Sequence, residues 1–274
     1  MFKIPAKDRI WEINEPQIMA ILNATPDSFY EGSRILDPKI AIQKTGFFIA
    51  QGANIIDIGG QSTRPGATPM DAKNEINKVV PIIEAIHDTY PSILISIDTF
   101  NSKVAAAALK AGAHIVNDIS CGKFDDNILT VVSNYNAGYI GMYLTGDINS
   151  MHTIAETEDL VQDIILFFEH KKKYLANKGI NQWVIDPGFG FGKTIPNNFL
   201  LVKQLAKLTT INLPILLGVS RKSSIYKTLQ TTANNALNGT TIVNTIGVLN
   251  GAQILRVHDV LEAKEVLTLM NYLK

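Results

Sequence analysis

The sequence predicts an α/β protein, and within that class it favours a single TIM (β/α)8 barrel. Eight short apolar runs recur along the 274 residues, with longer segments of helical character between them. Eight strand-helix units in about 250 residues match the size and order of a closed parallel sheet ringed by helices. Polar residues recur where the runs end, and in a barrel these positions converge on one rim. An open doubly wound sheet, the alternative, would spread them along an edge.

The apolar runs are predicted strands because each is short, rich in β-branched residues and nearly continuous in apolarity, as strands buried on both faces are. They are QIMAILN (17–23), NIIDIG (54–59), ILISID (93–98), HIVND (114–118), YIGMY (139–143), QWVID (182–186), PILLGV (214–219) and QILRV (253–257). The polar residues near their carboxyl ends are Asn23, Asp57, Asp98, Asn117, Tyr143, Asp186, Ser220 and His258. We expect these side chains to meet at one rim of the barrel.

Helical signals fill the segments between the strands. Asp37 followed by Pro38 predicts a helix start, and Gly52 predicts its end directly before the second strand. Apolar residues at 76, 79, 83 and 86 mark one face of a second helix, in which Pro81 predicts a kink or a late start. No linker, charge block or low-complexity tract interrupts the chain. We therefore expect one domain over residues 1–274, with a short N-terminal lead-in.

Composition argues against several classes of partner. Lys and Arg number 25, as do Asp and Glu, so the net charge attracts neither nucleic acid nor a membrane surface. Cys121 is the only cysteine, which excludes an intramolecular disulfide and a zinc site built on cysteine spacing. The N-terminus lacks a secretory signal, and no apolar run nears the roughly 18 residues of a membrane span. We expect a cytoplasmic protein.

The segment DPGFGFGKT, residues 186–194, combines a carboxylate at a strand end with glycines and two phenylalanines. A plain flexible turn is the simpler interpretation. The pairing of a carboxylate with aromatic rings instead favours a flat, hydrogen-bonding ligand at the mouth of the barrel. A nucleotide P-loop is excluded because its glycine and lysine spacing is absent.

Two basic clusters follow the seventh and eighth strands. SRKSS, residues 220–224, places an Arg-Lys pair before serines that can begin a helix, and RVHDV, residues 256–260, alternates Arg256 with His258. Taken alone, the first cluster is most simply a solvent-exposed basic turn, and the histidine of the second is most simply a structural residue. Together they lie where TIM barrels often bind phosphate, so they predict an anion site.

The segments NATPDSFYEGS (23–33) and GGQSTRPGATP (59–69) follow the first two strands. They are either variable surface or lids that close over a substrate, and their charged residues favour lids. Beneath them Asp57, Asp98, Asn117 and Asp186 would crowd acids into one cavity. Such crowding is unfavourable unless a cation or a donor-rich ligand satisfies the acids.

The ordered set NATPDSF, DIGGQSTRPGA, SIDTF, GAHIVNDIS, DPGFGFGK, SRKS and RVHDV resembles dihydropteroate synthases from Ile18 to about Leu267. The resemblance implies a TIM barrel, a homodimer and bound Mg²⁺. It also implies a reaction in which a dihydropterin carrying a hydroxymethyl pyrophosphate condenses with p-aminobenzoate, giving dihydropteroate and pyrophosphate. The implied mechanism is dissociative, with pyrophosphate leaving first.

The resemblance also implies residue roles. Its catalytic residues are Asn23, Glu31, Arg64, Lys222, Arg256 and His258, with Asn23 also the magnesium contact. Its substrate-binding residues are Phe29, Thr63, Pro65, Asp98, Asn117, Met142, Asp186, Phe191 and Ser223. Asp98, Asn117, Asp186 and Lys222 would meet the pterin edge, and Met142 and Phe191 would flank its ring. Asn23, Arg256 and His258 would meet the pyrophosphate. The p-aminobenzoate contacts would be Phe29, Thr63, Arg64, Pro65 and Ser223.

Three positions depart from the family pattern. Tyr143 replaces a histidine, Gln61 stands where glutamate is commoner, and Ser33 replaces a glycine. Glu31 keeps the charge, but not the length, of the usual aspartate. Two alternatives stay open: a diverged pterin-binding protein without activity, and a pterin-binding methyltransferase barrel, which would not need TPDSF, STRPG or SRKS.

Overall fold

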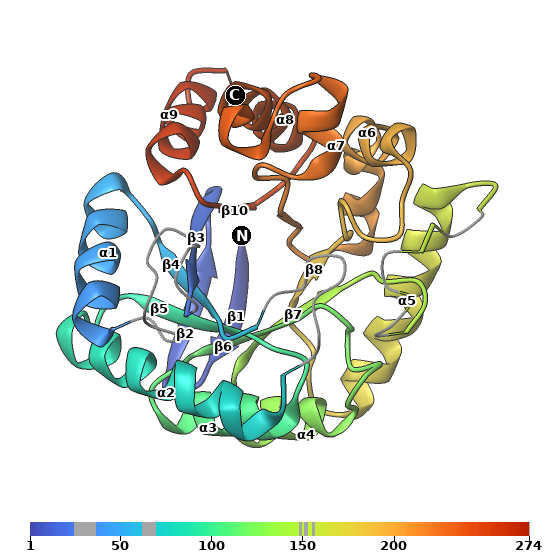
Figure 1. Cartoon of the computed structure of the whole chain (residues 1–274). Coiled ribbons are helices and arrows are strands. Elements are labelled where there is room, and N and C mark those ends of the chain that lie inside the picture. Colours follow the sequence, from blue (N-terminus) through green and yellow to red (C-terminus); the bar gives the residue numbers. More distant parts are fainter. Residues whose placement is uncertain (25–36, 62–69, 148–149, 151–152, 155–156, 274) are drawn as a thin grey trace.

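The computed structural model describes residues 1–24, 37–61, 70–147, 150, 153–154 and 157–273. Its central sheet has eight parallel strands in the order β8-β7-β6-β5-β4-β3-β10-β9. A parallel bridge between Ile185 and Ile215 joins the two ends of this sheet, so that it closes into a barrel surrounded by helices (Figure 1). The prediction of a TIM barrel is confirmed, and the open doubly wound alternative is wrong.

All eight predicted strands are present, and each overlaps its predicted run. They are β3 (Gln17–Asn23), β4 (Ile55–Gly59), β5 (Leu94–Asp98), β6 (Ile115–Asp118), β7 (Gly138–Met142), β8 (Val184–Asp186), β9 (Leu216–Leu217) and β10 (Ile254–Val257). Side chains that point outward along these strands pack under the helices in one large apolar core. The alternate side chains point into the barrel, because successive residues of a strand face opposite sides.

Helices lie between the barrel strands, and the first one begins and ends where its caps predict. They are α1 (Pro38–Gln51), α2 (Ala72–Thr89), α3 (Ser102–Lys110), α4 (Asn127–Asn134), α5 (Leu160–Asn177), α6 (Ile195–Lys203), α7 (Ser223–Thr228), α8 (Leu237–Leu249) and α9 (Val260–Met270), with 3-10 turns η1 (Leu205–Ile211) and η2 (Ala233–Asn235). Asp37 caps α1 by accepting from Lys39 N at 2.8 Å, and Gly52 ends it at φ 103°. Pro81 lies inside α2, so the predicted late start is wrong. No helix in the described ranges combines the length and apolarity needed to cross a membrane.

The N-terminal lead-in is an antiparallel hairpin of β1 (Phe2–Ala6) and β2 (Arg9–Ile13), which the strand prediction missed. Its inward side chains pack against the first residues of the barrel strands in a second apolar cluster, formed by Ile4, Ala6, Trp11, Ile13, Met19, Ile55, Ile115, Ile140, Val184, Leu216 and Ile254. Trp11 is 1% exposed, and its indole N–H donates to Gln17 Oε1 at 2.7 Å. The hairpin therefore plugs the amino end of the barrel and leaves the carboxyl end for a ligand.

We predict that Trp11→Ala lowers the free energy of unfolding by about 3–5 kcal/mol, the usual cost of truncating a buried aromatic side chain. Denaturant unfolding measures this change. Lys3→Ala on the same hairpin, whose side chain is 60% exposed, is the control and should change stability by less than about 0.5 kcal/mol. Equal losses in the two variants would show that the hairpin does not plug the barrel.

Candidate active site

Polar side chains replace apolar ones in the barrel interior toward the carboxyl ends of the strands. Asp57 and Ser96 lie side by side on β4 and β5, and Asp98 lies beside Asn117 across β5 and β6. Asp57, Ser96 and Asn117 are each less than 5% exposed. The interior is thus apolar next to the hairpin and polar at the opposite mouth.

Arg256 on β10 joins two of these acids. Its Nε donates to Asp57 Oδ2 at 2.6 Å, and its Nη2 donates to Asp98 Oδ2 at 2.6 Å. Asn117 Nδ2 donates to the same Asp57 oxygen at 3.0 Å. Although burial opposes it, the pairing with Asp57 and Asp98 raises the pKa of Arg256 above its ordinary value. The guanidinium therefore stays charged and neutralises part of the acid cluster.

Asp98 and Asp186 share this electrostatic environment. Burial raises the pKa of Asp98, against the opposing effect of Arg256, and the charge of Asp186 contributes to the rise. Burial also raises the pKa of Asp186, while Lys222 and Arg256 lower it. Arg256 acts on both acids and Lys222 interacts with both, so the two carboxylates and the two cations form one electrostatic cluster.

Lys222 and two aromatic residues border the acids. Lys222 Nζ donates to the carbonyl of Phe189 and lies 4.7 Å from the centroid of the Phe191 ring. Burial lowers the pKa of Lys222 to about 8, although Asp186 opposes the shift. Phe191 packs on the small cluster that contains Met142, which is 2% exposed. An apolar wall therefore stands beside the hydrogen-bonding groups.

Asn23 lies at the exposed carboxyl end of β3, beside Gly59 of β4. A Cβ atom added at Gly59 would lie 3.9 Å from Asn23 Oδ1 and 3.8 Å from Asp98 Oδ2. Both oxygens thus border the same small space above the glycine, and a side chain at position 59 would enter it.

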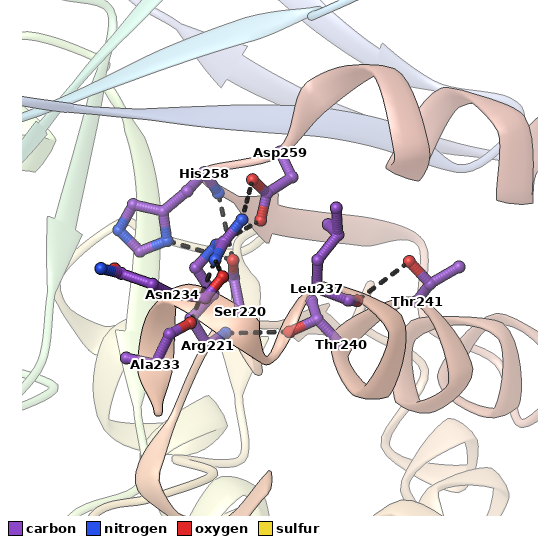
Figure 2. A network of polar contacts seen from close by, with 9 residues as sticks. All are labelled: Ser220, Arg221, Ala233, Asn234, Leu237, Thr240, Thr241, His258 and Asp259. Atoms are coloured by element: carbon purple, nitrogen blue, oxygen red, sulfur yellow. Dashed lines mark hydrogen bonds and ion pairs between the residues drawn. The ribbon is translucent and has the colours of Figure 1, made fainter. Parts of the chain in front are cut away.

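The two basic clusters, 220–224 and 256–260, differ in what their side chains contact (Figure 2). Arg221 lies in the left-handed region at φ 52° and forms a bidentate pair with Asp259, with both N–O distances 2.8 Å. It also donates to the carbonyls of Ala233 and Asn234. Arg221 therefore connects its own loop with the segments that contain Asp259 and Ala233. The prediction of an Arg-Lys anion receptor is wrong for this residue. His258 stays near the mouth, with Nδ1 3.1 Å from Ser220 Oγ.

Tyr143 does not join the rim, as the sequence predicted it would. It is the first residue after β7, one position beyond the inward-facing Met142, so its side chain points outward. Its ring packs edge-to-face on Phe167 of α5, with 5.2 Å between centroids, and lies 4.9 Å from Lys193 Nζ. The position where the family usually has histidine is therefore outside the mouth.

The remaining predicted residues lie at the edges of the cavity or outside the described part. Ser223 is exposed and is the first residue of α7, next to Lys222. Five predicted residues lie outside the described residues: Phe29, Glu31, Thr63, Arg64 and Pro65.

Two ionisable residues near the site, one buried and one half-buried, were missing from the prediction. Glu75 on α2 is 1% exposed, and its carboxyl oxygens lack a hydrogen-bond partner among the described residues, although Thr99 is close enough to favour the ionised form. A Cβ at Gly60 would come within 2.7 Å of Glu75, so glycine is needed there. Lys193 donates to the loop that follows β8. The helical spacing of apolar residues predicted the buried face of α2. It gave no reason to expect that Glu75 also lies on this face.

This arrangement defines a class of protein: a TIM barrel with a polar small-molecule site at its carboxyl rim. The family model described as "Pterin binding enzyme" matches residues 19–258. A dihydropteroate synthase of Synechocystis is 40% identical over 246 residues, covering 89% of this chain and 85% of that protein. The chain belongs to the dihydropteroate synthase family of pterin binding enzymes.

Solved structures agree with this assignment. The dihydropteroate synthase of Yersinia pestis, crystallised with a sulfonamide drug, superposes with a TM-score of 0.92 at 34% identity over 99% of both chains. That of Xanthomonas albilineans, crystallised with 4-aminobenzoic acid, gives a TM-score of 0.91 at 31% identity over 99% of this chain and 97% of that one.

We predict that Glu75→Gln removes part of the pH dependence of stability. Burial raises the pKa of Glu75 from 4.5 to about 7, so its contribution is fully present below pH 4.5 and is lost as the pH rises to 7. Relative to the wild type, the variant should gain about 3 kcal/mol in the free energy of unfolding between pH 4.5 and pH 8.

Denaturant unfolding at several pH values measures this gain. The control is Glu84→Gln, on the exposed side of the same helix. Parallel stability curves for Glu75→Gln and the wild type would contradict the raised pKa.

Proposed function

We propose that the chain condenses a hydroxymethyl-dihydropterin pyrophosphate with p-aminobenzoate. The methylene C–O bond breaks and pyrophosphate leaves; a C–N bond then forms to the aromatic amine, which loses a proton. The observation that carries this proposal is the clustering of Asp98, Asn117, Asp186 and Lys222 at the barrel mouth, where Asn117 lies beside Asp98 and Lys222 interacts with both acids. Membership of the dihydropteroate synthase family supports the same reaction.

The pterin would bind by its hydrogen-bonding edge. Carboxylates accept N–H groups, the Asn117 amide both donates and accepts, and Lys222 donates to oxygen. Met142 and Phe191 would flank the ring, and their cluster supplies an apolar surface beside the polar groups. A donor-rich heterocycle also satisfies buried acids that otherwise repel one another.

The pyrophosphate would lie on the basic side of the mouth. Arg256 already holds Asp57 and Asp98, and His258 lies beside Ser220 on the neighbouring strand end. Positive groups there stabilise the charge that grows on the departing oxygen. The acids, with Glu31 proposed among them, would support the transient cation at the methylene carbon. Phe29, Thr63, Arg64, Pro65 and Ser223 are the proposed p-aminobenzoate contacts.

We also propose Mg²⁺ as the cofactor, with Asn23 as a ligand. Asn23 Oδ1 and Asp98 Oδ2 border the same space above Gly59, and magnesium prefers oxygen. The described residues contain no group of three or more His, Cys, Asp or Glu side chains able to hold a metal. A site with few protein ligands fits magnesium, which usually keeps waters and takes substrate phosphates. The ion would neutralise charge on the leaving pyrophosphate.

Neither alternative function is favoured. Tyr143 points away from the mouth, so replacing histidine at this position removes no group from it. The chain's relatives are dihydropteroate synthases, and the segments that a methyltransferase barrel would not need are all present. A single pterin-binding domain over residues 1–274 and a cytoplasmic location remain predictions, the latter supported by a lone cysteine that is buried.

We predict pyrophosphate release that requires the pterin pyrophosphate, p-aminobenzoate and magnesium together. Lys222→Met should lower the rate by about 100-fold or more, because it removes a charged donor from the site. A coupled pyrophosphate assay measures the rate. Lys203→Met on α6, an exposed lysine, is the matched control and should keep wild-type activity. No release by folded wild-type protein under these conditions would overturn the proposed function.

We further propose that the chain forms a homodimer through α8. Ile242, Ile246 and Leu249 are spaced as one helical face and are 51%, 39% and 60% exposed. Helices α7, α8 and α9 lie together on one side of the barrel (Figure 1), and Leu229 and Leu261 add exposed apolar area there. The formal net charge of zero means that two copies meeting at this face have no overall repulsion to overcome.

We predict that Ile246→Asp converts the dimer to a monomer, because it buries an unpaired charge at the interface. Light scattering after size exclusion measures the mass. Leu166→Asp, at an exposed leucine of α5 on another side, is the control and should remain dimeric. A wild-type monomer, or dissociation by both variants, would overturn the assignment to α8.

A further inference from the structure

Two lysines hold the glycine-rich segment 187–192 of the loop that links β8 to α6, and one of them, Lys193, directly follows this segment. Lys222 Nζ donates to the carbonyl of Phe189. Lys193 Nζ donates to the carbonyl of Gly188 at 2.7 Å and to that of Phe191 at 3.1 Å. Three carbonyls of one short loop are therefore bound by ammonium groups. Lys222 belongs to the proposed pterin site, whereas Lys193 has no role in the proposed reaction.

The loop needs such support because its backbone is permissive. Gly188, Gly190 and Gly192 adopt φ values of 72°, 86° and 58°, which glycine reaches without strain but also leaves easily. Its N–H groups are held by Asp186 Oδ1, which accepts from Gly188 N at 2.7 Å, and by Asn198 Oδ1, which accepts from Gly190 N at 2.6 Å. The lysines add the matching contacts on the carbonyl side.

Tyr143 covers the ammonium of Lys193. Its ring centroid lies 4.9 Å from Lys193 Nζ, and its backbone N–H donates to Asp186 O at 2.8 Å. A Cβ at Gly188 would lie 2.2 Å from the Tyr143 carbonyl oxygen, so the loop and the end of β7 are in close contact. Lys193 and Tyr143 also line a cavity of about 90 Å³ with Asp163.

Phe191 connects Lys193 with the mouth of the barrel. Its carbonyl accepts from Lys193, while its ring lies 4.7 Å from Lys222 Nζ and packs with Met142. Loss of the Lys193 contacts would free this residue's backbone without removing any group that faces the mouth. The effect on a ligand would therefore be transmitted through the loop.

We propose that Lys193, covered by the Tyr143 ring, is a positioning residue that holds the glycine-rich loop so that Phe191 and Asp186 face the pterin. This inference rests on the proposed function, because it concerns the same pterin site. Lys193 does not contact the substrate; it acts through the carbonyls of Gly188 and Phe191. A lysine that served stability alone would leave pterin affinity unchanged.

The test compares Lys193→Met with Lys193→Arg and with Lys203→Met, an exposed control on the following helix. Fluorescence titration with 6-hydroxymethylpterin gives the pterin Kd, and steady-state assays at saturating pterin pyrophosphate give the KM for p-aminobenzoate. Lys193→Met should raise the pterin Kd about tenfold and change that KM by less than about twofold, because two charged hydrogen bonds to the pterin loop are lost. Lys193→Arg, which keeps the charge, should recover most of the affinity.

Tyr143 supplies a second pair of variants. Tyr143→Phe should bind pterin like the wild type, because the ring face and not the hydroxyl covers the ammonium. Tyr143→Ala should weaken binding by about threefold to tenfold, the effect of a lost cation–π contact.

The outcomes separate this inference from the proposed function. A wild-type protein that does not bind the pterin would overturn the proposed function. If the wild type binds the pterin and Lys193→Met has an unchanged pterin Kd, only the positioning role is overturned. The same holds if Lys193→Met raises the pterin Kd and the KM for p-aminobenzoate by equal factors. If Lys193→Met does not fold, an unchanged pterin Kd in Tyr143→Ala would overturn the role.

Discussion

The ion pairs of Arg256 with Asp57 and Asp98 are the interaction on which the candidate site depends. Asp57 is fully buried, and two carboxylates at this depth would repel each other and lose hydration without a cation between them. Arg256 on β10 reaches across β3 to both acids, and Asn117 donates to the same Asp57 oxygen, while Asp57 Oδ1 has no hydrogen-bond partner among the described residues. This network keeps polar groups at the barrel mouth oriented before any ligand arrives, as binding with little reorganisation requires.

The second half of the site is a loop rather than a strand end. The segment after Asp186 is rich in glycine, and lysine contacts on its carbonyls compensate for that freedom. Burial lowers the pKa of both Lys193 and Lys222, to about 7 and about 8, because both amino groups are withdrawn from water, and the charge of Asp186 opposes the shift. The acid network and the supported loop are linked by the electrostatic interactions of Lys222 with Asp98 and Asp186.

The architecture could be predicted from the sequence because each buried parallel strand appears as a short, continuous apolar run. Eight such runs follow one another along the chain. It missed the hairpin because FKIPA and RIWEI alternate buried and exposed residues over only five positions each. Residues at strand ends were predicted well where they point inward. Tyr143 was placed wrongly because one position along a strand reverses the direction of a side chain. The pairing of Arg256 with Asp57 spans 199 positions, which no local pattern reveals.

A crystal structure with bound pteroic acid, the oxidised form of the proposed product, tests the central claim most directly. The account predicts the heterocycle between Met142 and Phe191, its N–H edge on Asp186 and Asn117, and Arg256 still bound to Asp57. A ligand bound elsewhere on the barrel, or one that contacts neither Asp186 nor Asn117, would contradict it.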